Sequence, residues 1–206
     1  MLHAQKLISI DEVKIIIGGA CLDEILAAAE ITEPAEVLLI SPSVSSPAVT
    51  DAGDFVFRTY PSDVLAGEIA ANYAVQELNT KKAAVFTELT DYAQGLREVY
   101  KQSLASLGAQ VVADETYTTG DTDFRTQVLK IKAANPDVVY IVPQSGIPGL
   151  AILKQLKENG VKAVFTTAEV LLNRQLVLEN QETLEGLIGV ESAVDWKNNP
   201  KAKALH

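Results

Sequence analysis

Short apolar segments alternate with longer segments of helical periodicity along almost the whole chain. The short segments are rich in β-branched residues, as strands buried in a parallel sheet are. The longer ones repeat apolar residues every three or four positions, as amphipathic helices do. This alternation predicts an α/β fold with doubly wound parallel sheets, right-handed crossovers and flanking helices. The expected strands are 13–17, 37–40, 55–59, 83–86, 111–112, 138–142, 163–165 and 187–190.

The helical segments carry recognisable start and stop signals. Pro61-Ser62-Asp63 opens a long helix, and Leu65, Ile69 and Tyr73 form its apolar face. The segment 120–123 is expected to supply the N-cap of a later helix, which Asn135-Pro136 ends.

The strands divide into two groups. Residues 63–190 contain five expected strands with helices between them, enough for a complete flavodoxin-like unit. The first 60 residues contain three, which indicates part of another sheet. We therefore expect a partial N-terminal lobe at 1–62 and a flavodoxin-like C-terminal lobe at 63–206.

The polarity of such sheets indicates where a ligand binds. Ligands lie at the carboxyl ends of parallel strands, near a topological switch point. A site is therefore expected in the loops that follow the strands, which are 18–24, 41–48, 87–92, 142–148 and 166–170.

Composition excludes several classes of protein. The chain has 206 residues, of which 48% are hydrophobic and 21% charged, so a disordered chain is excluded. Its net charge of −10 argues against nucleic-acid binding and against an anionic membrane surface. No targeting segment or membrane-spanning run is visible, so we expect either a cytoplasmic protein or a processed or truncated chain.

Few residues could support catalysis, a metal or a cofactor. The histidines are His3 and His206, at the two ends of the chain, which argues against a catalytic triad or a histidine metal site. No phosphate loop or dinucleotide fingerprint is present. Asp121 and Asp123 are expected to cap a helix rather than to bind a metal, and Cys21 to be a buried, inert thiol. We therefore expect a protein that is not an enzyme and holds no cofactor.

Several motifs resemble one family in order and spacing. They are ISPSVSSP at 40–47, VFRT at 56–59, PSD at 61–63, DY at 91–92, QGL at 94–96, GDTDF at 120–124 and KIKAANPD at 130–137. The chain resembles the type I periplasmic solute-binding proteins, in the branch similar to the leucine/isoleucine/valine-binding proteins of ABC importers. The resemblance covers about 4–190 and implies two α/β lobes that close on a ligand between them.

Against that family the chain is short. The resemblance implies that the first two strands of the first lobe, and the return of the chain to that lobe, are missing. A first lobe without these strands exposes sheet edges and apolar surface, so we expect copies of the chain to self-associate.

The resemblance also implies a binding site for a free amino acid. Hydroxyl and backbone N–H groups of Ser43, Val44 and Ser45 would hold the carboxylate, and Glu169 would pair with the ammonium. Tyr92 corresponds to a family tyrosine that faces the cleft. The alternatives are a surface turn for 43–45, a solvated glutamate, and an aromatic residue at a helix start.

Two positions depart from the family pattern. Leu22 stands where a serine commonly contacts the ligand carboxylate, and Gln144 lies in a loop where leucine-binding relatives have an aromatic residue. Gln144 could hydrogen-bond a polar side chain or an amide, so the ligand need not be leucine.

Three functions remain open at this point. The first is a periplasmic or extracellular protein, lipid-anchored in its full-length context, that delivers a branched-chain or other small amino acid to an ABC permease. The second is a receptor domain that senses amino acids or small amides without transport. The third is a flavodoxin-like enzyme or receiver domain, against which the lack of internal histidines and phosphate motifs argues.

Overall fold

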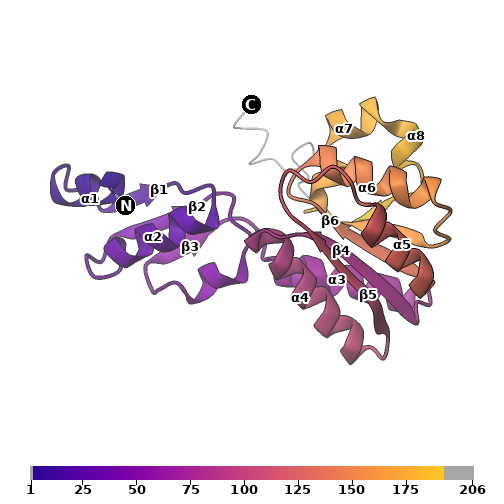
Figure 1. Cartoon of the computed structure of the whole chain (residues 1–206). Coiled ribbons are helices and arrows are strands. Elements are labelled where there is room, and N and C mark those ends of the chain that lie inside the picture. Colours follow the sequence, from indigo (N-terminus) through magenta and orange to yellow (C-terminus); the bar gives the residue numbers. More distant parts are fainter. Residues whose placement is uncertain (1, 193–206) are drawn as a thin grey trace, which may run out of the picture.

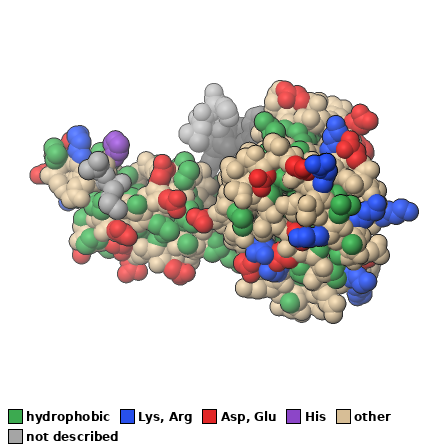
Figure 2. All heavy atoms as spheres, viewed as in Figure 1, with side chains coloured by type: hydrophobic (Ala, Val, Ile, Leu, Met, Phe, Trp, Pro, Cys, Tyr) green, Lys and Arg blue, Asp and Glu red, His purple; other side chains and the backbone are tan. Residues whose placement is uncertain are grey.

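The chain forms two separate parallel sheets, each with its own helices (Figure 1). The structure, a computed structural model, describes residues 2–192. Trp196, His206 and the predicted end of the C-terminal lobe lie outside the described residues. Lys and Arg side chains gather on the part of the molecule that holds the larger sheet (Figure 2). The α/β class with parallel sheets is confirmed.

The first part, which we call the three-stranded unit, comprises the elements from α1 to β3. Its strands are all parallel, in the order β1-β2-β3. Helix α2 and the short helix η1 pack on one face of the sheet, where Ile25, Leu39 and Val56 are buried. The elements are α1 (Leu2–Ser9), β1 (Ile15–Ile17), α2 (Leu22–Thr32), β2 (Leu38–Ser41), η1 (Pro47–Asp51) and β3 (Val56–Arg58).

The opposite face of this sheet is apolar and exposed. The register places Ile17 beside Ile40 and Ile40 beside Phe57, so these side chains share one face. Ile17 is 73% exposed, and Ile15 and Phe57 are also exposed. The prediction that 13–17 is a buried strand was therefore wrong, because no described residue covers this face or the outer edge of β1.

The second part, the five-stranded unit, comprises the elements from α3 to β8. Its strands are all parallel, in the order β5-β4-β6-β7-β8. The strands are β4 (Lys82–Glu88), β5 (Gln110–Tyr117), β6 (Val138–Val142), β7 (Val164–Thr167) and β8 (Ile188–Gly189). The helices are α3 (Asp63–Gln76), α4 (Asp91–Ser106), α5 (Arg125–Ala134), α6 (Gly146–Glu158), η2 (Glu169–Leu172), α7 (Arg174–Glu179) and α8 (Gln181–Leu184).

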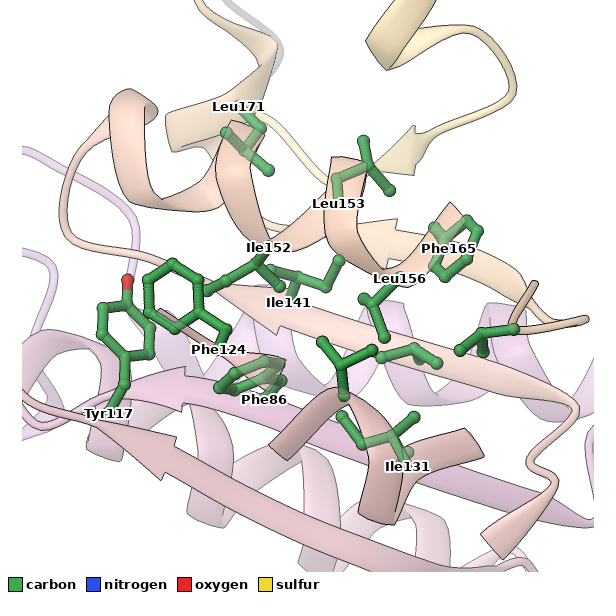
Figure 3. Close-up of a cluster of buried hydrophobic side chains, with 14 of the residues drawn as sticks. Phe86, Tyr117, Phe124, Ile131, Ile141, Ile152, Leu153, Leu156, Phe165 and Leu171 are labelled. Atoms are coloured by element: carbon green, nitrogen blue, oxygen red, sulfur yellow. The ribbon is translucent and has the colours of Figure 1, made fainter. Parts of the chain in front are cut away.

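Each face of the larger sheet has its own core. Helices α5 and α6 cover one face, where Phe86, Tyr117 and Phe124 meet edge to face with ring centroids 5.1–5.9 Å apart (Figure 3). Helices α3 and α4 cover the other face, where Tyr100 stacks on Tyr140 at 4.2 Å. Burial on both faces explains the continuous apolar runs of the central strands.

Helix α3 packs through small residues rather than through its bulky stripe. Its buried positions include Gly67, Ala70, Ala71 and Ala74, whereas Leu65, Ile69 and Tyr73 are exposed. A Cβ atom at Gly67 would lie 2.8 Å from Val99 Cγ1, so glycine permits the close approach of α3 to α4. The predicted apolar face 65–69–73 was therefore wrong, because close packing of backbones selected the alanine face.

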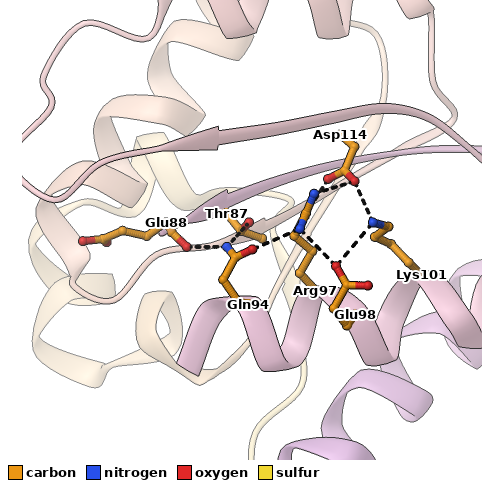
Figure 4. Close-up of polar contacts among 7 residues, drawn as sticks. All are labelled: Thr87, Glu88, Gln94, Arg97, Glu98, Lys101 and Asp114. Carbon is orange, nitrogen blue, oxygen red and sulfur yellow. Dashed lines mark hydrogen bonds and ion pairs between the residues drawn. The ribbon is translucent and has the colours of Figure 1, made fainter. Parts of the chain in front are cut away.

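Polar contacts fasten α4 to the edge strand β5. Arg97 donates from Nε and Nη2 to the two carboxylate oxygens of Asp114, both at 2.7 Å, and Lys101 lies 2.8 Å from the same carboxylate (Figure 4). Arg97 and Lys101 hold the pKa of Asp114 below its usual value, despite partial burial. The predicted strand 111–112 extends to Tyr117, because its acidic residues pair with neighbouring helices instead of ending the strand.

The start of α5 differs from the prediction. The N-cap residue is Phe124, which makes no capping hydrogen bond with its side chain. Asp123, one residue earlier, accepts a hydrogen bond from the Arg125 backbone N–H at 3.2 Å and so provides part of the predicted cap. The Asp123 side chain pairs with Arg125, and Asp121 Oδ2 accepts a hydrogen bond from the Thr118 backbone N–H. At the other end, the helix stops at Asn135-Pro136 as predicted, and Asn135 adopts a left-handed conformation with φ 48°.

The two units are joined through the segment between β3 and α3. The domain boundary at 62 stays a prediction, since two separate sheets are compatible with it without testing it.

Candidate ligand-binding site

A cavity of about 510 Å³ lies where the carboxyl ends of the two sheets meet. Residues from the loops after β1 and β2 line one side, and residues after β4, β6 and β7 line the other. All seven residues singled out from the sequence line it: Leu22, Ser43, Val44, Ser45, Tyr92, Gln144 and Glu169. The other lining residues are Ala20, Cys21, Asp23, Ser46, Asp63, Asp91 and Val170.

The hydroxyl-rich loop after β2 is held against the loop after β1. Ser41 Oγ donates to the Gly19 carbonyl at 2.9 Å and accepts from the Val44 N–H at 3.2 Å. Gly19 has φ +85°, and a side chain there would collide with Ile25. The Val44 side chain is buried in the core, so it anchors the loop while Ser43 remains exposed and Ser45 half-buried.

Ser45 is tied to the start of α3 by two hydrogen bonds. Its Oγ donates to Asp63 Oδ2, and its carbonyl accepts from the Asp63 N–H, both at 3.0 Å. Asp63 is only 2% exposed, and this burial raises its pKa to about 6 although Ser45 opposes the shift. Sequence reasoning used Asp63 only as part of a motif and a helix start, and did not assign it to the site.

Tyr92 and Glu169 lie on the side of the cavity formed by the five-stranded unit. Tyr92 is in the first turn of α4, where Thr90 Oγ1 accepts a hydrogen bond from the Ala93 N–H at 3.3 Å. The Tyr92 hydroxyl is buried and has no hydrogen-bond partner among the described residues. Burial, reinforced by the Glu169 carboxylate, raises the pKa of Tyr92.

Gln144 follows β6, and its side chain is exposed at the cavity. Its backbone N–H donates to Glu88 Oε2 at 2.9 Å. Glu88 lies at the end of β4 and was not identified from the sequence, since a glutamate after a strand gives no local sign of burial.

Cys21 and Leu22 lie at the start of α2. Cys21 is the N-cap and its thiol is free and exposed, so the prediction of a buried thiol was wrong. Cys21 is exposed because it lies in the loop after β1, at the carboxyl end of the sheet, where it lines the cavity. Leu22 is half-buried and packs against the core of the three-stranded unit.

The side chains that line the cavity define its chemistry. Asp23, Asp63, Asp91 and Glu169 provide carboxylates, and no lysine or arginine is among the lining residues. The serines of the 43–46 loop provide hydroxyl groups beside backbone N–H groups. Such a cavity can pair with a cationic group on one side and donate hydrogen bonds to an anionic group on the other.

The described part of the chain contains no cluster of three or more His, Cys, Asp or Glu side chains able to hold a metal ion. Within residues 2–192, no helix is both long enough and apolar enough to cross a membrane.

Comparison with known families identifies the class of protein. The sequence profile of a family described as "Periplasmic binding protein" matches residues 3–206. The chain belongs to this family of solute-binding proteins, as the motifs quoted above indicate.

The similar curated proteins are named for amino-acid binding. The chain is 29% identical over 203 residues to the leucine-, isoleucine-, valine-, threonine- and alanine-binding protein of Pseudomonas aeruginosa, an alignment covering 98% of this chain and 54% of that protein. It is 32% identical to the Leu/Ile/Val-binding protein of Citrobacter freundii, with 90% and 50% covered. The chain thus spans about half the length of the curated relatives it matches.

Solved structures agree with this assignment. The leucine-binding protein LivK of Thermotoga maritima superposes with a TM-score of 0.82 at 29% identity, covering 98% of this chain and 58% of that one. LivJ of Streptococcus pneumoniae, solved with isoleucine, gives a TM-score of 0.78 at 26% identity, with 98% and 58% covered.

Proposed function

We propose that this chain is the ligand-binding part of a solute-binding protein that captures a free amino acid. The observation that carries the proposal is the shared cavity, which is lined by serines of the three-stranded unit and by Glu169 of the five-stranded unit. A zwitterion needs both kinds of group, since an unpaired charge is costly to bury.

The two charged ends of the ligand would bind on opposite sides. The ligand carboxylate would accept hydrogen bonds from the Ser43–Val44–Ser45 loop. It would replace the Ser41 and Asp63 oxygens that now accept from the Val44 N–H and the Ser45 hydroxyl. The ligand ammonium would pair with Glu169 near the Tyr92 hydroxyl, which has a free hydrogen-bonding capacity among the described residues. Charge-assisted hydrogen bonds contribute about 1.5–3 kcal/mol each, so a few support micromolar binding.

The side chain of the ligand would lie among Leu22, Tyr92 and Gln144. Leu22 offers an apolar surface in place of the serine hydroxyl of the family pattern, so position 22 adds no hydrogen bond to the ligand carboxylate. Gln144 adds an amide that can hydrogen-bond a polar side chain. Several relatives are named for leucine, isoleucine and valine, and one also for threonine and alanine, which supports a small amino acid.

The cellular role proposed is delivery of this amino acid to an ABC permease, from the periplasm or the extracellular surface. A ligand held by groups from both units would favour their closed arrangement. An amino-acid receptor that regulates a partner without transport would use the same site. Reconstituted transport with the permease distinguishes the two roles, because only the first predicts ligand uptake.

A thermal-shift screen against the twenty amino acids tests the binding site. Ligand at 100 times its Kd adds about 2.7 kcal/mol to the free energy of unfolding, which raises Tm by roughly 5–10 °C for a chain of this size. Glu169→Gln should abolish most of the shift by weakening the ammonium pairing at least about tenfold.

The matched control is Glu158→Gln, at the exposed end of α6, which should keep the full shift. A cooperative melt without any ligand-dependent shift in the parent protein would contradict the proposal for this chain.

We also propose that copies of this chain associate through the three-stranded unit. The exposed Ile15, Ile17 and Phe57 side chains and the unpaired outer edge of β1 support this.

A further inference from the structure

Glu88 is a buried carboxylate at the carboxyl end of the central strand β4. It is 2% exposed, and no described lysine or arginine forms an ion pair with it. Three donors satisfy it instead. Tyr117 OH and the Gln144 N–H donate to Oε2, each at 2.9 Å, and the Thr119 hydroxyl donates to Oε1 at 2.5 Å.

These donors come from different loops at one end of the sheet. Tyr117 ends β5, Thr119 follows it, and Gln144 follows β6, 56 positions along the chain from Glu88. The Glu88 carbonyl also accepts a hydrogen bond from Gln94 Nε2 at 2.8 Å, which joins the strand end to α4 (Figure 4). Glu88 therefore contacts both the Gln144 loop and α4, the helix that carries Tyr92. Tyr92 and Gln144 both line the cavity.

The contact with Gln144 has a particular geometry. Glu88 binds the backbone N–H of Gln144, while the Gln144 side chain remains exposed at the cavity. Breaking this hydrogen bond would leave a buried donor and acceptor less well satisfied, which is costly whether the acceptor is a carboxylate or an amide oxygen. Glu88 thus holds the backbone of Gln144 in place, while the Gln144 side chain lies at the cavity.

We propose that Glu88 is a positioning residue for ligand selectivity, which acts by holding Gln144 in place at the cavity. This inference rests on the proposed function, because it assumes that a ligand side chain meets Gln144. It predicts that the length of residue 88 alters ligand preference without contact between Glu88 and the ligand.

The test compares three substitutions at position 88. Glu88→Gln keeps the length and an oxygen that can accept from Gln144, so it should behave like the parent protein. Glu88→Asp keeps the charge but withdraws the carboxylate by one methylene, and Glu88→Ala removes all acceptors. Asp137→Asn is the control, because Asp137 accepts hydrogen bonds from the backbone N–H groups of Lys81 and Lys82 at the opposite end of β4, away from the cavity.

Hydrogen exchange at the Gln144 amide provides a measurement that needs no ligand. Exchange should accelerate at least about tenfold in Glu88→Asp and Glu88→Ala, and stay within about twofold of the parent in Glu88→Gln and Asp137→Asn. Unchanged protection in Glu88→Asp would overturn the proposal, even if Glu88→Ala fails to fold.

Calorimetry with L-leucine and L-glutamine as probes measures selectivity. Glu88→Asp should change the ratio of the two Kd values about fivefold or more, and in a Gln144→Ala background it should change that ratio less than about twofold. Equal changes in both backgrounds would indicate a merely structural role and overturn the proposal. If neither probe binds the parent protein, the proposed function fails for these ligands and the exchange measurement alone decides the role of Glu88.

Discussion

At the residue scale, the site depends on carboxylates that local sequence does not distinguish from surface ones. Asp63 and Glu88 are both 2% exposed. Neither position carries a local sequence signal of burial, since Asp63 begins helix α3 and Glu88 ends strand β4. The serine loop at 43–45 and Glu169 could be named because the family resemblance marks them. Asp63 and Glu88, by contrast, are buried through contacts with residues distant in the chain, such as Ser45 and Gln144.

Asp63 makes stability depend on pH. Its pKa rises from 3.8 to about 6 on folding, because burial disfavours the charged form. Between these values the folded chain binds more protons than the unfolded chain, so the contribution of Asp63 to stability decreases as pH rises through 6. The contribution of Asp63 to the free energy of unfolding is therefore about 3 kcal/mol smaller at pH 8 than at pH 3.

Asp63→Asn removes this ionisation while keeping an oxygen that can accept from Ser45. The gain in free energy of unfolding relative to the parent should therefore be larger at pH 8 than at pH 4. Chemical denaturation at both pH values measures it, and an equal effect of the substitution at the two values would contradict the assigned pKa.

At the element scale, packing distance selected which helix face is buried. Helix α3 presents glycine and alanine to its neighbours, while the bulkier Leu65, Ile69 and Tyr73 remain exposed. Periodicity located the helix correctly, because helical repeat is a local property. It misidentified the inner face, since both faces carry apolar residues and only the neighbouring helix α4 distinguishes them.

The contact between α4 and β5 predicts a measurable coupling. Arg97 and Asp114 are 19% and 26% exposed and form two hydrogen bonds. A double-mutant cycle with Arg97→Ala and Asp114→Ala should give a coupling of about 1 kcal/mol at pH 7, reduced by solvent screening.

The same coupling should weaken in acid. Because the pKa of Asp114 is lowered on folding, its contribution is present above 3.8 and is lost as pH falls through the folded value. A coupling free energy that is unchanged down to pH 2 would show that the charge of Asp114 does not contribute to the interaction with Arg97.

At the scale of the whole molecule, one face of the three-stranded unit is apolar and exposed. Ile15, Ile17 and Phe57 lie on that face beside the free edge of β1. Exposed edges and apolar patches promote association.

Ile17→Lys should therefore reduce self-association by placing a charge on this face. Light scattering over a concentration series measures the effect, and Leu129→Lys is the matched control because Leu129 is exposed on α5, in the other unit. A parent protein that stays monomeric at high concentration would contradict the expected association.

The sequence by itself determined the alternation of strands and helices, the α/β class and the five loops that provide most of the cavity lining. These follow from hydrophobic periodicity and from the fixed polarity of parallel strands, which are properties of short segments. Tertiary structure alone decided that Cys21 and Ile17 are exposed and that Asp63 and Glu88 are buried. Burial depends on which distant segment packs against a residue, and the sequence of one short segment does not specify which other segments pack against it.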